Sequence, residues 1–74
     1  MTETYGEYTL EALPRQVRIG RYSVNVLVSR MIEGKRKSVR FSADDGIYYI
    51  LEIEAVKESF NLGRNLIDRG LTGF

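Results

Sequence analysis

The chain contains no cysteine, no histidine and no tryptophan. The lack of cysteine excludes disulfides and thiol chemistry, and it removes the usual clue to the redox compartment. Because zinc sites use cysteine and histidine, and most general bases depend on histidine, this composition excludes most enzyme classes. A short chain with one core also has little means of forming a deep cleft that would tune its carboxylates or lysines. We therefore expect a protein that is not an enzyme and that has no metal and no cofactor.

Long apolar runs are also missing. No stretch approaches the roughly 20 apolar residues that a membrane-crossing helix needs, and the opening MTETYGEY is acidic and polar, unlike a signal peptide. The 74 residues contain one proline, no repeat and no linker, which predicts one domain over residues 1–74. These features predict a cytoplasmic protein with no membrane partner.

The net charge of +1 is unevenly distributed along the chain. Residues 15–40 hold eight cations and one acid, whereas the other residues hold nine acids and three cations. The middle of the chain therefore has a formal charge of +7, and the two ends together have a formal charge of −6. Such a division favours a surface that attracts an anionic partner.

Alternating apolar and polar residues predict strands in the first half of the chain. The clearest strand spans about residues 21–32, and its apolar side carries Tyr22, Val24, Val26 and Val28. The stretch EGK then predicts a hairpin turn built on Gly34, followed by a strand over about residues 36–42. These two strands are expected to pair.

An earlier strand is predicted over about residues 5–13, where Pro14 would end it or place it at an edge. The stretch VRIG that follows could extend this strand or begin the next one, and a turn at Ile19 and Gly20 is the preferred interpretation. The three strands would then form an antiparallel meander.

From about residue 50 the apolar period becomes that of a helix, which is predicted over about residues 50–69. Its apolar side carries Ile53, Val56, Phe60, Gly63 and Ile67. Gly70 is expected to cap the carboxyl end. No good capping residue stands before Glu52, so residues 47–51 could form a strand, a loop or the first helical turn.

Together these elements predict an α+β fold, in which a three-stranded antiparallel sheet packs on one C-terminal helix in two layers, βββα. The valine side of the sheet would meet the helix, leaving the opposite sheet face uncovered. Gly63 is expected to allow the helix to approach the sheet closely, and Arg64 is expected to pair with Asp68 one turn later.

The end of the chain, EAVKESFNLGRNLIDRGL, resembles that of small uncharacterised bacterial domains with a strand-strand-strand-helix layout. Their helix has an E-A pair, then an aromatic residue or leucine, G-R, any residue, an aromatic residue or leucine, and I-D. The matching positions here are Glu54, Ala55, Leu62, Gly63, Arg64, Leu66, Ile67 and Asp68. The stretches YGEYTLEA and GRYSVNVLVSR add to the resemblance. It implies the same fold and no known activity.

The layout is also similar to that of DNA-binding domains built on a three-stranded sheet, such as the plant ethylene-response-factor domain and the arm-binding domains of tyrosine recombinases. Those domains place the uncovered sheet face in the major groove. The similarity concerns layout and basic strands, because the tryptophans common in the plant domain are missing here.

The uncovered face is the candidate binding surface, since strand alternation gives it arginine, serine and asparagine side chains. Arginine binds phosphate or guanine through its forked donors, and asparagine can pair with adenine. The candidate nucleic-acid-binding residues on this face and the adjoining hairpin are Arg18, Arg21, Asn25, Lys35, Arg36, Lys37 and Arg40. The expected partner is DNA or RNA.

Three alternatives stay open at this stage. The basic face could bind an acidic protein or a second copy of the chain, or it could be an ordinary solvated sheet face whose arginines discourage edge pairing. The five tyrosines could stack on single-stranded bases or pack at the margin of the core. Asp44 and Asp45 before Gly46 predict a turn, because they lack the pattern of a calcium loop.

Overall fold

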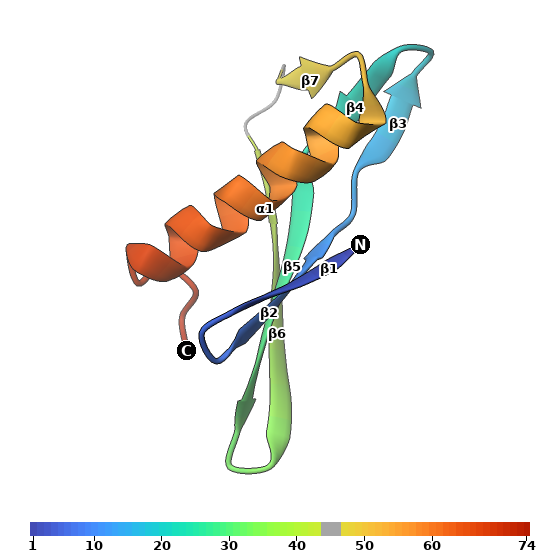
Figure 1. Ribbon diagram of the computed structural model, residues 1–74. Coiled ribbons are helices and arrows are strands. Elements are labelled where there is room, and N and C mark those ends of the chain that lie inside the picture. The colour runs from blue at the N-terminus through green and yellow to red at the C-terminus, as the bar shows by residue number, and fades with distance from the viewer. Residues whose placement is uncertain (44–46) are drawn as a thin grey trace.

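The structure is a computed structural model, and it describes residues 1–43 and 47–74 (Figure 1). It confirms the α+β class, with antiparallel sheets and a C-terminal helix. The prediction of a single three-stranded sheet was wrong, because the described residues form seven strands in two sheets. The turn and the acidic pair expected at residues 44–46 lie outside the described residues.

The larger sheet has four antiparallel strands in the order β1-β2-β5-β6. Their bounds are β1 Thr2–Tyr5, β2 Tyr8–Ala12, β5 Asn25–Ile32 and β6 Lys35–Ser42. The strand expected over residues 5–13 is therefore replaced by a hairpin, whose turn includes Gly6 at a φ of 61°. The meander of β2, β5 and β6 was correctly ordered, but β1 extends it by one strand that the sequence did not reveal.

The smaller sheet has the order β3-β4-β7, with β3 Arg15–Arg18, β4 Arg21–Ser23 and β7 Tyr48–Tyr49. The expected turn at Ile19 and Gly20 joins β3 to β4, and Gly20 has a φ of 70°. The open question about residues 47–51 is answered by β7, which pairs with β4.

The strand expected over residues 21–32 is divided at Val24, because the backbone groups of Val24 and Asn25 form hydrogen bonds with residues of other segments. Leu13 N donates to Asn25 O at 3.0 Å, and Ala43 N donates to Val24 O at 3.1 Å. Asn25 N donates to the Ser59 hydroxyl at 3.2 Å. The chain can therefore pass from the smaller sheet into the larger one without leaving these backbone groups unpaired.

The helix α1, Glu52–Asp68, runs obliquely across the strands and packs on one side of them (Figure 1). The core between helix and sheet consists of Leu10, Ala12, Val26, Val28, Val56 and Phe60. Gly63 is buried against this core, as expected. Ile53 was wrongly assigned to it: the residue is 48% exposed, because the first turn lies beyond the strands that supply the core.

The end of α1 is closed by a Schellman arrangement, with Gly70 N donating to Ile67 O at 3.0 Å and Leu71 N donating to Leu66 O at 2.9 Å. Gly70 has a φ of 67°, so the expected glycine cap is confirmed. The expected pairing of Arg64 with Asp68 is wrong. Both side chains instead reach β1, which they hold against the helix: Arg64 pairs with Glu3, and Asp68 accepts the Tyr5 hydroxyl.

The molecule is elongated, with extents of 42 × 20 × 16 Å. One end is the hairpin of β5 and β6, which projects beyond β2 and α1, and the other end holds the smaller sheet (Figure 1). In the projecting part only two cross-strand rows remain, Met31 with Arg36 and Ile32 with Lys35. In the sheet as described, β6 is an edge strand over its full eight residues.

Candidate anion-binding hairpin

The hairpin between β5 and β6 has a tight two-residue turn at Glu33 and Gly34. Their φ angles are 51° and 77°, the positive pair that a type I′ turn requires, and glycine takes this conformation at little cost. A turn of this kind fixes the register of the strands. It therefore fixes which face each cation of β6 occupies.

Four cations follow the turn, Lys35, Arg36, Lys37 and Arg40, and we call them the basic hairpin. All four are exposed. The register places Arg40 opposite Leu27 and Arg36 opposite Met31, on the face away from the helix. Lys35 and Lys37 alternate with them and lie on the other face. The ribbon therefore carries positive charge on both sides.

None of these four cations forms an ion pair with a carboxylate of the described residues, whose ion pairs join Arg30 to Glu7 and Arg64 to Glu3. Arg36 donates from Nη2 to the Ser29 hydroxyl at 3.2 Å, and Ser29 in turn shares a hydrogen bond of 3.0 Å with Ser38. This contact orients the guanidinium along the sheet and uses one of its five N–H donors. The charge of Arg36 stays available to a ligand.

Asn25 is not available as a base-contacting residue. Its side chain is 8% exposed, and both ends of its amide are bonded: Nδ2 donates to the Ser23 hydroxyl at 2.9 Å, and Oδ1 accepts from the Ser42 hydroxyl at 2.6 Å. Burial and these two bonds leave little of the amide accessible to a base. Asn25 instead fastens the junction between the two sheets.

Arg18 and Arg21 lie apart from the basic hairpin, in the smaller sheet at the opposite end of the molecule (Figure 1). They are cross-strand partners and line a shallow pocket of about 290 Å³ with Val17 and Tyr48. The seven candidate residues therefore do not form one surface. Four of them form the basic hairpin, Asn25 is buried between the two sheets, and Arg18 and Arg21 lie in the smaller sheet.

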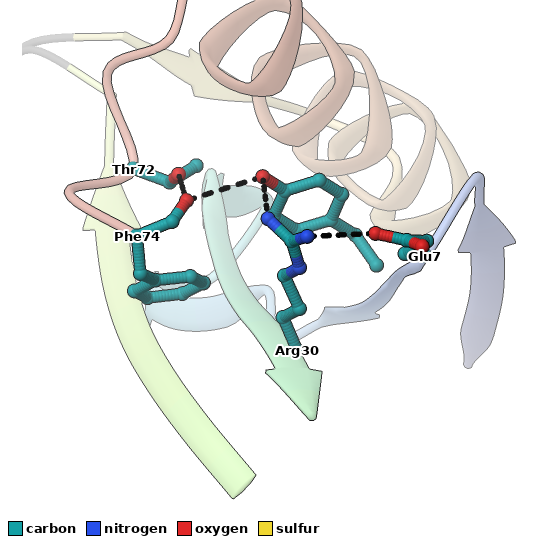
Figure 2. Close-up of polar contacts among 5 residues, drawn as sticks. Glu7, Arg30, Thr72 and Phe74 are labelled. Carbon is teal, nitrogen blue, oxygen red and sulfur yellow. Dashed lines mark hydrogen bonds and ion pairs between the residues drawn. The ribbon is translucent and has the colours of Figure 1, made fainter. Parts of the chain in front are cut away.

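Arg30 belongs to the basic segment of the sequence, but its charge is already compensated (Figure 2). Its Nη2 pairs with Glu7 Oε2 at 2.7 Å, and its Nη1 donates to the Tyr8 hydroxyl at 3.3 Å. The guanidinium also lies 5.3 Å from the centre of the Tyr8 ring. Strand alternation could have signalled this difference, since Arg30 shares the parity of Val26 and Val28, which face the helix.

The Tyr8 hydroxyl links this cluster to the last residue described. It donates to Phe74 O at 3.2 Å, and the Thr72 hydroxyl donates to the same carbonyl at 3.2 Å (Figure 2). The rings of Tyr8 and Phe74 stack with centroids 6.3 Å apart. Tyr8 thus packs at the margin of the core, where it connects β2, β5 and the segment after the helix.

Within residues 1–43 and 47–74, no group of three acids lies close enough to hold a metal ion. None of the described helices combines the length and apolarity needed to span a bilayer. No protein-family model matches the chain, and no curated protein or solved structure is significantly similar to it. The resemblance to small bacterial domains therefore stays a prediction.

Proposed function

We propose that the chain is a small non-enzymatic binding module whose basic hairpin contacts an anionic partner, nucleic acid in the first place. One observation supports this most directly: four exposed cations lie along β6, two of them on the projecting part of the hairpin, and none has a carboxylate partner among the described residues. Solubility does not require such a concentration of one sign at one end of a small domain. A bound polyanion would neutralise this concentration of positive charge.

The shape of the hairpin favours duplex DNA. A two-stranded ribbon fits the major groove, which is about 12 Å wide. Cations on both faces of the ribbon can then approach the phosphates on both walls, as Arg36 and Lys35 would from opposite sides. This proposal narrows the surface expected from the sequence, because the amide of Asn25 is occupied and Arg18 and Arg21 lie at the other end.

The experiment is an anisotropy titration of labelled duplex and single-stranded DNA over a series of salt concentrations. If the four cations each replace a counterion, the logarithm of the association constant should fall with the logarithm of salt with a slope of roughly −3 to −4. Arg36→Ala should weaken binding and flatten that slope by about 1. Binding that is absent even at about 50 mM salt would exclude nucleic acid as the partner.

The matched control is Lys57→Ala. It removes the same charge from an exposed position on the helix, beyond which the hairpin projects (Figure 1). Binding and salt slope should stay unchanged. An equal loss in this control would mean that net charge, and not the basic hairpin, determines binding. An acidic protein is indicated as the partner by a different result. In that case the wild type binds neither DNA form but binds acidic polypeptides, and Arg36→Ala fails to bind those polypeptides.

A further inference from the structure

The end of the molecule opposite the basic hairpin exposes an unusual number of large apolar side chains. We call the following six residues the apolar end: Val17, Ile19, Tyr48, Ile50, Leu51 and Ile53. Ile19 is 97% exposed and Ile50 is 67% exposed. Single exposed apolar residues are common on soluble proteins, but a concentration at one site indicates an interaction surface.

These residues come from the smaller sheet and from the short segment that joins it to the helix. Tyr48 pairs with Ser23, and Tyr49 pairs with Tyr22. Ile50 and Leu51 are the two residues that connect β7 to α1. The helix begins at the next residue, so Ile53 lies in the adjoining first turn.

A β-bulge brings Val17 to the same surface. The pairing of β3 with β4 shifts between Gln16 and Arg18, so that Val17 and Arg18 together oppose Arg21. A bulge re-aims side chains that would otherwise point to opposite faces. As a result Val17, Arg18 and Arg21 line one pocket with Tyr48, and the two arginines border the apolar end on its sheet side.

Two acids border the same surface on its helix side. Glu52 and Glu54 lie in the first turn of α1 and are exposed. No cation of the described residues forms an ion pair with either of them, and the same holds for Arg18 and Arg21. The apolar end thus has cations beside its sheet residues and acids beside its helix residues, and neither group has an ion-pair partner in the described part of the chain.

We propose that this chain forms a twofold homodimer through the apolar end, with Arg18 and Arg21 of each copy facing Glu52 and Glu54 of the other. A twofold interface joins the same patch on both subunits, so it requires a surface that is complementary to itself. An apolar centre with cations beside its sheet residues and acids beside its helix residues meets that requirement. The proposal does not depend on the nucleic-acid interaction, because the basic hairpin lies at the other end of the molecule.

The charges also favour a second copy over a lipid surface. Isoleucines beside arginines could insert into an anionic membrane, but Glu52 and Glu54 would then face negatively charged headgroups. A second copy satisfies all four charged residues. Association would also add buried apolar area to a chain that is too short to bury much on its own.

Sedimentation equilibrium of the purified chain at about 10–100 µM, a range typical of weak to moderate association, tests the proposal. The wild type should be a dimer, and Ile19→Asp and Leu51→Asp should both sediment as monomers with unchanged circular dichroism. Met31→Asp is the matched control, because Met31 is 61% exposed but lies at the hairpin end. This variant should remain a dimer.

Charge reversal provides a test that a folding defect cannot mimic. One variant carries Arg18→Glu with Arg21→Glu, and the other carries Glu52→Arg with Glu54→Arg. Each alone should lose dimer affinity at least about tenfold through like-charge repulsion, and an equimolar mixture should recover it as a heterodimer. Three results would overturn the proposal: a monomeric wild type at all these concentrations, an intact Ile19→Asp dimer, or a monomer that co-sediments with vesicles containing phosphatidylserine.

Discussion

Gly63 of α1 lies directly on Leu10 of β2, so closely that a Cβ at position 63 would be 3.0 Å from Leu10 Cδ2. The same Cβ would be 3.1 Å from Cγ2 of Val26. Leu10 and Val26 are fully buried, which leaves them little room to move. The separation of helix and sheet is therefore set by the missing side chain at this position.

Enlarging Gly63 should destabilise the fold according to the size of the new side chain. Gly63→Leu should cost about 3 kcal/mol or more of unfolding free energy, through overpacking of a filled core. Gly63→Ala should cost much less, because alanine gains about 1 kcal/mol of helix propensity that offsets the tighter contact. Urea unfolding measures both. Lys57→Leu, at an exposed helix position, is the control and should change stability by no more than about 0.5 kcal/mol.

Ser59 should be required for stability although it is a small polar residue. Its hydroxyl is fully buried, donates to Ala55 O at 2.7 Å and accepts from Asn25 N at 3.2 Å. Ser59→Ala should cost about 1–2 kcal/mol despite the better helix propensity of alanine, because the Asn25 amide is left without a partner. Thermal and urea unfolding would show this. An effect as small as that of Asn65→Ala, at an exposed helix position, would mean that water or a backbone shift replaces the bond.

The contact between Tyr5 and Asp68 should appear in the tyrosine titration. The Tyr5 hydroxyl donates to Asp68 Oδ1 at 2.7 Å, and this hydrogen bond to a carboxylate raises the pKa of Tyr5 above its ordinary value of 10.0. Absorbance at alkaline pH, compared between the wild type and Tyr5→Phe, isolates this phenol. Asp68→Asn should bring the pKa of Tyr5 back toward the ordinary value.

The same contact gives a pH dependence of stability with a defined sign. The folded state favours the neutral phenol, so the stabilisation is complete below the unfolded pKa of about 10 and is lost as pH rises through the higher folded pKa. The stability difference between wild type and Tyr5→Phe should therefore stay constant up to about pH 9 and shrink at more alkaline pH. A difference that grows with pH would contradict this assignment.

The two faces of the basic hairpin should contribute comparably to DNA affinity. Arg36→Ala with Arg40→Ala removes the charges of the face away from the helix, and Lys35→Ala with Lys37→Ala removes those of the other face. If the ribbon enters a groove, each pair should flatten the salt slope by roughly 2. The same anisotropy titration measures both variants. If Lys35→Ala with Lys37→Ala has the salt slope of the wild type, only the face that carries Arg36 and Arg40 lies against the duplex.

The sequence predicted the parts of the fold that depend on local periodicity. The valines at 24, 26 and 28 are buried as their alternation implied, and the turns at Gly20 and Gly34 and the cap at Gly70 occur where glycine was needed. The division of the strand at Val24 was not predictable in this way. It depends on hydrogen bonds donated by Leu13 and Ala43 and on one accepted by Ser59, residues that are distant in the sequence.

The candidate surface was predicted less well, because it too depends on contacts between residues that are distant in the sequence. Alternation gives the face of a strand but not the sheet to which that strand belongs, so Arg21 and Arg36 were assigned to one surface although they lie in different sheets. Exposure was also overestimated at Asn25, whose neighbours Ser23 and Ser42 become hydrogen-bond partners only after the strands pair. The basic hairpin was found because both its turn and its charges are local.

Because β6 is an edge strand, its cations have a second role. An eight-residue edge with unpaired backbone groups is a template on which further chains could add and grow into aggregates. Two such edges in full antiparallel contact would place Lys37 of each chain directly opposite Arg40 of the other, and the repulsion between them opposes the contact. Concentrated salt screens that repulsion. Storage in dilute buffer should therefore keep the protein in solution longer than storage at high ionic strength.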